Sequence, residues 1–377
     1  MDLLIKNGIK PCGCVNLPPS KSEAIRAALL YALAGEDPRL AVGGFPPPYC
    51  TDVEDALNAA QHLMHAYVGA SAALMRFMIP IQAALYGRVN ISADEVLYRR
   101  GLREAEECLG VSLTPTPGTD SIDRELRLAQ NRYEIDCSRS SQFLSGLMIA
   151  LPLLKHECEI VIKNGLVSGP YAEMTFGFVK AFGGDIERTD RGFITRPSVY
   201  RAPESALVSG DSSYAAVFEA MNLLGGEIML LGKMDGMQPD SRFLMISSLP
   251  VIDVSDCPDL MPILAAAACG KAGDTVITGT ARLSTKESDR PKAIETLIRA
   301  LGGSAERRDD RLMIHGSGWL RGGRCSACGD HRIAFAAAAA SLLCREPVVI
   351  EGAECVKKSA FGFWEDMERI GFELCRM

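Results

Sequence analysis

A unit of two helices and two short strands recurs along this chain of 377 residues. Each copy begins with an apolar, small-residue helix, continues through a short strand and a polar turn, and closes with a second helix and a final strand. In one copy, helices at 258–270 and 286–303 are each followed by a strand, at 274–279 and 304–308. Such recurrence predicts a duplicated fold of α/β architecture.

Four further copies follow the same order. The expected first helices lie at 71–85, 140–154, 211–226 and 330–343, the second helices at 101–110, 171–184, 241–249 and 358–372, and the strands at 88–93, 111–117, 158–164, 185–189, 227–232, 251–256, 346–352 and 373–377. The first helices are apolar on most faces, so we expect them to be buried.

Length and composition suit two domains with large cores, since 47% of the residues are apolar. The net charge of −7 argues against a nucleic-acid partner. The negative net charge does not exclude a small anionic substrate, because a local cluster of cations can create a positive potential at one site.

The start of the chain has no signal-peptide pattern, and its longest apolar stretch, Ile333 to Cys344, is too short to cross a bilayer. The thirteen cysteines have no regular spacing, and the single CxxC at 325–328 is a weak metal signal. We therefore expect a reduced, cytoplasmic protein, without membrane contact, metal or cofactor, and monomeric.

A run of charged and hydroxyl side chains, residues 286–290, stands where one of the expected helices begins. The first amides of a helix lack partners and attract anions, and Lys286 and Arg290 add two positive charges. Glu287 between them would repel a bound anion, which makes sense if a proton must move nearby. By itself, the run could equally be a solvated helix cap.

Other helix starts carry residues that capping does not explain. Asp259 and the serines at 140 and 141 are ordinary caps, but Gln142, His331 and Arg332 are not. If such helix starts converge on one cleft, their dipoles and side chains form a strong anion site.

The N-terminal part of the chain has its own cationic helix start. Lys21 and Ser22 lie at the beginning of an apolar helix, with Arg26 about one turn inside on the same face. Hydroxyls and an ammonium group at a helix start suit a phosphate. Arg76, Arg100 and Lys358 occupy matching places near other helix starts, which is hard to assign to chance.

These motifs together resemble the 3-phosphoshikimate 1-carboxyvinyltransferase family, also called EPSP synthases. The resemblance rests on SKS-x-x-x-R, SSQ, SGPY, PDL, KESDR, DHR and a late K-S, in the family's order over nearly the whole chain. It implies two similar domains of repeated βαβαββ-type units, an inside-out α/β barrel fold. The domains would be 18–208, and 1–17 with 209–377, with the active site in the cleft between them.

The resemblance also implies the reaction, the transfer of the enolpyruvyl group of phosphoenolpyruvate to the 5-hydroxyl of shikimate 3-phosphate with release of phosphate and no cofactor. It implies that Asp259, Glu287 and Lys21 are catalytic. The residues implied to bind shikimate 3-phosphate are Lys21, Ser22, Arg26, Ser140, Ser141, Gln142, Ser168, Tyr171, Asp259 and Lys286. Those implied to bind phosphoenolpyruvate are Lys21, Ala72, Arg100, Gln142, Arg290, His331, Arg332 and Lys358.

The chain departs from the family pattern in its N-terminal part. A strand-containing stretch is nearly absent between the helix at 51–63 and the segment from Tyr67, so the first repeat is truncated. Ala72 stands where the family has a Gly beside the phosphoenolpyruvate site, which also receives the family's competitive inhibitor glyphosate. Three functions are therefore open. The chain could be an active EPSP synthase, an enolpyruvyl transferase for another acceptor, or a non-catalytic protein that binds an anionic metabolite.

Overall fold

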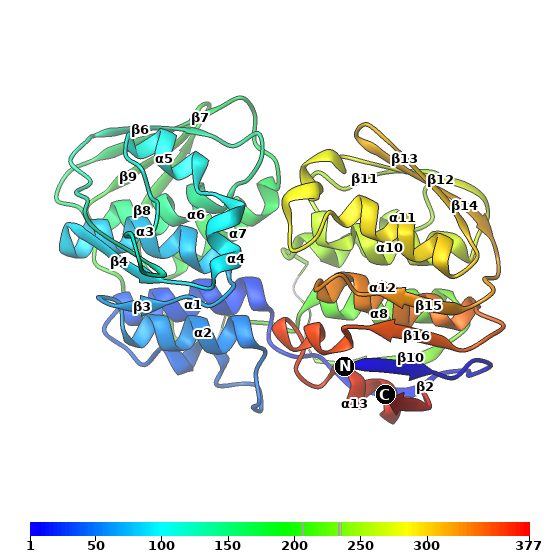
Figure 1. Cartoon of the computed structure of the whole chain (residues 1–377). Helices are drawn as coiled ribbons and strands as arrows, with labels where there is room; N and C mark the ends of the chain where they lie inside the picture. The colour runs from blue at the N-terminus through cyan, green and yellow to red at the C-terminus, as the bar shows by residue number, and fades with distance from the viewer. Residues whose placement is uncertain (206, 233, 235) are drawn as a thin grey trace. The chain divides into compact units, whose positions relative to one another are not determined.

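The computed structural model describes all residues except 206, 233 and 235 (Figure 1). The chain forms two compact units, each with its own hydrophobic core. We call Pro19–Val208 the N-terminal unit, and Met1–Pro18 with Ser209–Met377 the C-terminal unit.

The C-terminal unit is built from helices at its centre and three sheets. Its helices are α8 (Ser212–Leu223), α9 (Phe243–Ile246), α10 (Met261–Cys269), α11 (Arg290–Ala300), α12 (His331–Ala340) and α13 (Phe363–Arg369), with 3-10 turns η3 (Pro239–Arg242), η4 (Pro258–Leu260), η5 (Ala281–Thr285), η6 (Ser341–Leu343) and η7 (Ala353–Lys358). Its strands are β1 (Asp2–Ile5), β2 (Cys12–Asn16), β10 (Glu227–Leu231), β11 (Val251–Asp253), β12 (Ala272–Thr278), β13 (Ser304–Arg308), β14 (Arg311–Ser317), β15 (Gly323–Ser326), β16 (Val348–Glu351) and β17 (Leu374–Arg376). Over the described residues the sheets have the orders β15-β16-β1-β17, β11-β12-β14-β13 and β10-β2.

The N-terminal unit has two sheets over its described residues, β6-β7-β9-β8 and β3-β4-β5. Its strands are β3 (Ala66–Tyr67), β4 (Arg88–Ser92), β5 (Ser121–Glu125), β6 (Arg132–Asp136), β7 (Cys158–Lys163), β8 (Asp185–Thr189) and β9 (Gly192–Arg196). Its helices are α1 (Lys21–Leu33), α2 (Thr51–Gln61), α3 (Ala72–Tyr86), α4 (Glu95–Arg100), α5 (Arg103–Leu109), α6 (Gln142–Ala150) and α7 (Gly169–Ala181), with 3-10 turns η1 (Pro38–Val42) and η2 (Leu151–Leu153).

The recurring unit of the sequence is a βαβαββ unit in space. In the N-terminal unit, β6 pairs parallel with β7, which pairs antiparallel with β9, which pairs antiparallel with β8. In the C-terminal unit, β11, β12, β14 and β13 repeat this pattern. The sheet β15-β16-β1-β17 repeats it again, with β1 from the start of the chain as one of its last two strands. The predicted fold class is therefore confirmed.

Helices lie inside and sheets outside in each unit. Every residue of α10 and α12 is buried, and alanine is the commonest residue in both, so the two helices pack closely against each other. Figure 1 shows this pair between the strands of two sheets. In the N-terminal unit α3 approaches α6 so closely that a Cβ at Gly146 would lie 2.5 Å from the carbonyl oxygen of Arg76. Buried helices present their N-termini, rather than their sides, to a ligand.

The first repeat of the N-terminal unit is short, as the sequence indicates. Only the two-residue strand β3 separates the end of α2 from the turn that leads into α3. One expected strand is wrong, because residues 111–117 form no strand and β5 closes that repeat further along the chain. Pro115 and Pro117 explain the error, since proline has no N–H to donate to a sheet ladder.

Candidate functional site

Arg290 is the centre of a buried ionic network in the C-terminal unit. Its Nε lies 2.8 Å from Oδ2 of Asp330, one terminal nitrogen 2.7 Å from Oδ1 of Asp259, and the other 2.9 Å from Oε2 of Glu287. The arginine is 1% exposed. Burial alone would lower its pKa, but the three carboxylates outweigh burial and raise the pKa of Arg290 well above its ordinary value.

Three helix starts bring this network together. Arg290 is the first residue of α11, which Asp289 caps by accepting from the backbone N–H of Lys292. Asp330 caps α12 by accepting from the N–H of Arg332, while Asp259 lies in the 3-10 turn before α10. These three helices contact one another. The predicted capping by Asp330 is confirmed, whereas Asp259, expected as a cap, is the second residue of η4.

More of the predicted residues join the network through its carboxylates. A terminal nitrogen of Arg332 lies 3.0 Å from Oδ2 of Asp259, and Nζ of Lys358 lies 3.2 Å from Oε1 of Glu287. Asp259 and Glu287 thus each lie between two cations. His331 bonds through Nε2 to the Ser359 hydroxyl at 2.8 Å and is 1% exposed.

Lys286 precedes the network on the chain and is half-buried. Burial lowers its pKa to about 8, although Asp259 and Glu287 act in the opposite direction. A lysine with such a pKa exchanges its proton close to neutral pH, so Lys286 can act as a proton donor or acceptor as well as a charge.

In the N-terminal unit the predicted Lys21 lies at the start of α1 and pairs with Asp52. Its Nζ is 3.1 Å from Oδ2 of Asp52, a carboxylate that is only 4% exposed and whose other oxygen has no hydrogen-bond partner. Sequence reasoning missed Asp52, because an acidic residue in the first turn of a helix is an ordinary dipole partner. Its burial beside a lysine is visible only in the structure.

Arg26 binds protein groups in this structure. It donates to Oγ1 of Thr175 at 2.7 Å and to the carbonyl oxygens of Ser22 at 2.6 Å and Tyr171 at 3.1 Å. Its guanidinium also lies over the ring of Phe77, and burial lowers its pKa to about 10. Arg26 therefore ties α1 to α7.

The starts of α6 and α7 carry the remaining predicted hydroxyl and amide side chains. The Ser141 hydroxyl donates to the carbonyl oxygen of Ser168 at 3.1 Å, and the hydroxyl of Ser140 accepts from the backbone N–H of Gln142 at 3.2 Å. Ser168 has a positive φ of 54° and accepts from the N–H of Tyr171. The structure thus brings these five residues together at the two helix starts.

Ala72 and Arg100 are connected through Arg76. Ala72 is the first residue of α3, and Arg76 donates to its carbonyl oxygen at 3.3 Å and to that of Gly101 at 2.9 Å. Arg100 is the last residue of α4, immediately before Gly101. Arg76 therefore holds the helix start with Ala72 against the loop with Arg100.

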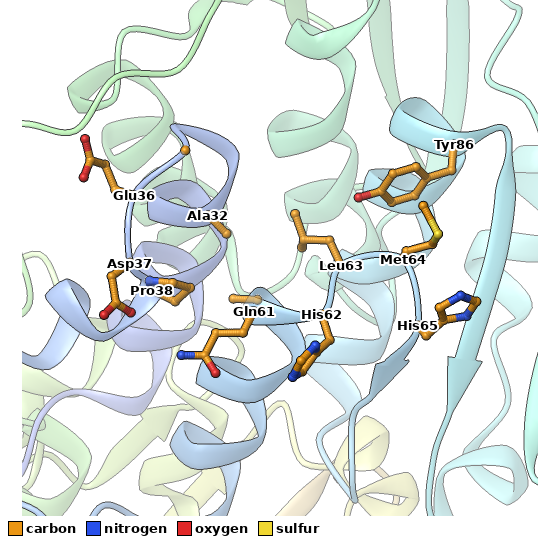
Figure 2. A pocket seen from close by; sticks show the side chains of 12 residues that line it. Ala32, Glu36, Asp37, Pro38, Gln61, His62, Leu63, Met64, His65 and Tyr86 are labelled. Carbon is orange, nitrogen blue, oxygen red and sulfur yellow. The ribbon is translucent and has the colours of Figure 1, made fainter.

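A groove of about 740 Å³ lies elsewhere in the N-terminal unit, beside the ends of α1, α2 and α3 (Figure 2). Glu36, Asp37, His62 and Tyr86 are among its lining residues. Carboxylates and helix C-termini are both negative, so this groove does not suit an anionic substrate. Lys21, Arg290 and Arg332 lie at helix starts, whereas Arg100 and Lys358 are the last residues of α4 and η7, and none of these cations lines the groove.

Neither a metal centre nor a membrane helix emerges from the described residues. No group of three or more His, Cys, Asp or Glu side chains in this part of the chain could hold a metal ion. Within the same residues, no helix is long and apolar enough to cross a membrane. All thirteen cysteines are free thiols.

Two units of repeated βαβαββ topology, with cations and carboxylates at their helix starts, define the chain as a protein of the enolpyruvyl transferase fold. Solved structures agree: an EPSP synthase from Acinetobacter baumannii superposes with a TM-score of 0.78 over 100% of both chains, at 20% identity. The family described as EPSP synthase (3-phosphoshikimate 1-carboxyvinyltransferase) matches residues 60–234 and 238–367, and the chain belongs to this family.

Relatives with that same name cover nearly the whole chain. The 3-phosphoshikimate 1-carboxyvinyltransferase of Clostridium kluyveri is 32% identical over 98% of this chain and 97% of its own. That of Clostridium acetobutylicum is 31% identical over 96% of both. The first alignment spans 419 positions against 377 residues here, so the relative has residues that this chain lacks, in keeping with a truncated repeat.

Proposed function

We propose that this chain transfers the enolpyruvyl group of phosphoenolpyruvate to the 5-hydroxyl of shikimate 3-phosphate and releases phosphate. Membership of the EPSP synthase family and the names of its relatives support the reaction. In the addition step, the 5-oxygen bonds to C2 of phosphoenolpyruvate, the hydroxyl loses its proton and C3 gains one. In the elimination step, C3 gives up a proton and the bond from C2 to the phosphate oxygen breaks.

Binding is the first task, because each substrate carries a phosphate and a carboxylate and the two repel each other. In the structure Arg290, Arg332 and Lys358 are held by carboxylates of the protein. Anionic substrates would replace those carboxylates as partners of the cations. Holding the two reactants in contact can be worth an effective molarity of ~10⁵ M or more.

Proton transfer is the second task, and three groups can share it. As a substrate anion draws cations away, Asp259 and Glu287 are freed to accept or return a proton. Lys286, whose pKa is about 8, can supply a proton near neutral pH.

The observation that carries the proposal is that Asp259 and Glu287 each contact two cations. A protein that only binds anions has no use for carboxylates there, because they compete with its ligand. A transferase needs both the cations and the proton acceptors.

Phosphate release by the purified chain tests the proposal. Release should require both shikimate 3-phosphate and phosphoenolpyruvate, and a chelator such as EDTA should not stop it. Reactions that lack either substrate serve as controls. Absence of release with both substrates present, or release that depends on a divalent metal, would refute the proposed reaction.

We further propose the parts of the chain that activity requires, the compartment of the enzyme and its oligomeric state. The residues proposed to bind the substrates belong to both units, so both are required for activity. The free thiols suit a reducing compartment, and we propose a cytoplasmic monomer. Sedimentation at micromolar concentration should give the mass of one chain, 40.6 kDa.

A further inference from the structure

Asp240 is a buried carboxylate next to the ionic network that the sequence did not single out. It lies in η3, is 2% exposed, and accepts a hydrogen bond from the hydroxyl of Ser213 through Oδ2. Its other oxygen, Oδ1, is buried and has no hydrogen-bond partner. A buried oxygen that accepts no hydrogen bond lowers the stability of the fold, so a functional reason for Asp240 at this position is worth seeking.

Arg332 has a buried hydrogen-bond donor without an acceptor, whereas Asp240 has a buried acceptor without a donor. Arg332 is 6% exposed, and one terminal nitrogen donates to Asp259, but its Nε is buried without an acceptor. Asp240 and Arg332 are close enough that each influences the charge of the other. An unused donor and an unused acceptor therefore lie in the same buried region, belonging to groups that attract each other when both are charged.

The surroundings of Asp240 explain why Asp240 and Arg332 do not form an ion pair in the structure. Burial, together with Asp259, raises the pKa of Asp240 to about 7, against the lowering effects of Arg332 and Ser213. Asp211 also raises the pKa of Asp240, and Asp240 in turn raises that of Cys257. Burial and the charge of Asp259 therefore disfavour a second charged carboxylate beside Asp259 while Arg332 remains bound to Asp259.

We propose that Asp240 is a second docking group for Arg332, which leaves Asp259 and donates through Nε to Asp240 when an anionic ligand binds. The ligand then takes the terminal nitrogens of the guanidinium, and Asp240 loses its proton to solvent. Asp259 is freed from one of its two cations at the moment when a substrate is in place. This proposal rests on the proposed function, since it assumes that Arg332 receives an anionic substrate. Asp240 is in this sense a positioning residue.

The exchange predicts a proton count that needs no turnover. Sulfate is a tetrahedral dianion that does not titrate near pH 7, so any proton released on its binding comes from the protein. Isothermal titration with sulfate at pH 7, in two buffers of different ionisation enthalpy, should show proton release attributable to Asp240, because a carboxyl with a pKa of about 7 is partly protonated at this pH. Lys286 would contribute a small uptake of opposite sign.

Two variants and a matched control test whether Asp240 is the group that releases the proton. Asp240→Asn should abolish this release, and Arg332→Lys, which lacks a guanidinium Nε, should diminish it even if Asp240→Asn folds poorly. Glu219→Gln is the control, because burial raises the pKa of Glu219 to about 7 with no charged neighbour among the causes. It should release the same number of protons as the unmodified chain.

Kinetics give the second readout. In Asp240→Asn we expect the KM for phosphoenolpyruvate to rise about tenfold at neutral pH, with a smaller effect on kcat, and Glu219→Gln should leave both unchanged. Equal proton release by the unmodified chain and Asp240→Asn would overturn the docking exchange, even in an active enzyme. Normal proton release without any phosphate release from the substrates would instead refute the proposed reaction and leave the exchange standing.

Discussion

Replacing Arg290 by Ala should destabilise the C-terminal unit strongly, because this one side chain holds three carboxylates. Removing one partner of a buried ion pair typically costs about 3–5 kcal/mol. Here Asp259 keeps Arg332 and Glu287 keeps Lys358, whereas Asp330, which is 0% exposed, loses its ion pair with Arg290 and keeps hydrogen bonds from the Ser288 hydroxyl and the Arg332 N–H. We therefore expect the low end of the range, about 3 kcal/mol.

Urea unfolding followed by tryptophan fluorescence measures this effect in the right unit. The chain has two tryptophans, Trp319 and Trp364, and both belong to the C-terminal unit. Trp364 is 5% exposed, so its emission should change when that unit unfolds. With a slope of about 2 kcal/mol per molar urea, a loss of about 3 kcal/mol lowers the midpoint by about 1.5 M.

Arg308→Ala is the matched control, because Arg308 pairs with Glu306 on an exposed strand. Exposed pairs contribute little, so its midpoint should stay close to that of the unmodified chain. The urea midpoint of Arg290→Lys should lie between those of Arg290→Ala and Arg308→Ala, since lysine keeps the charge but cannot direct three nitrogens at three carboxylates. A midpoint for Arg290→Ala no lower than that for Arg308→Ala would show that the network does not stabilise the fold.

Four further predictions concern activity. Lys358→Ala should raise the KM for phosphoenolpyruvate by roughly ten- to a hundred-fold, because it removes a charge-assisted bond of roughly 1.5–3 kcal/mol; an unchanged KM would exclude Lys358 from the binding site. Glu287→Gln keeps the shape but not the proton acceptor, so kcat should fall much more than binding, and near-normal turnover would remove Glu287 from the proton transfers. Because burial lowers the pKa of Lys286 to about 8, its charge is present below pH 8 and lost above it. Substrate KM should therefore rise above pH 8, and Lys286→Arg should shift this rise to higher pH. Ala72, where the family has Gly, should weaken glyphosate inhibition about ten- to hundred-fold through an added methyl group, and Ala72→Gly should restore it; tight inhibition of the unmodified chain would contradict this placement.

Most of the fold could be predicted from the sequence, because its signals are local and repeated. The apolar helices that became α10 and α12 are followed by short strands and polar turns, and the same order recurs in five places. The segment at 111–117 is the exception. It has an apolar start, but its two prolines cannot take part in a sheet ladder, so the chain closes the repeat with β5 instead.

The sequence by itself also indicated the candidate site residues, since arginine, lysine and histidine near helix starts exceed what capping requires. It did not determine how they pair. That Arg290 pairs with Asp259 and Asp330, that Arg26 binds Thr175, and that Lys21 pairs with Asp52 each depend on residues more than 30 positions apart. Burial and pairing are properties of the packed structure, and only there does an ordinary Asp become the partner of a lysine that we propose to be catalytic.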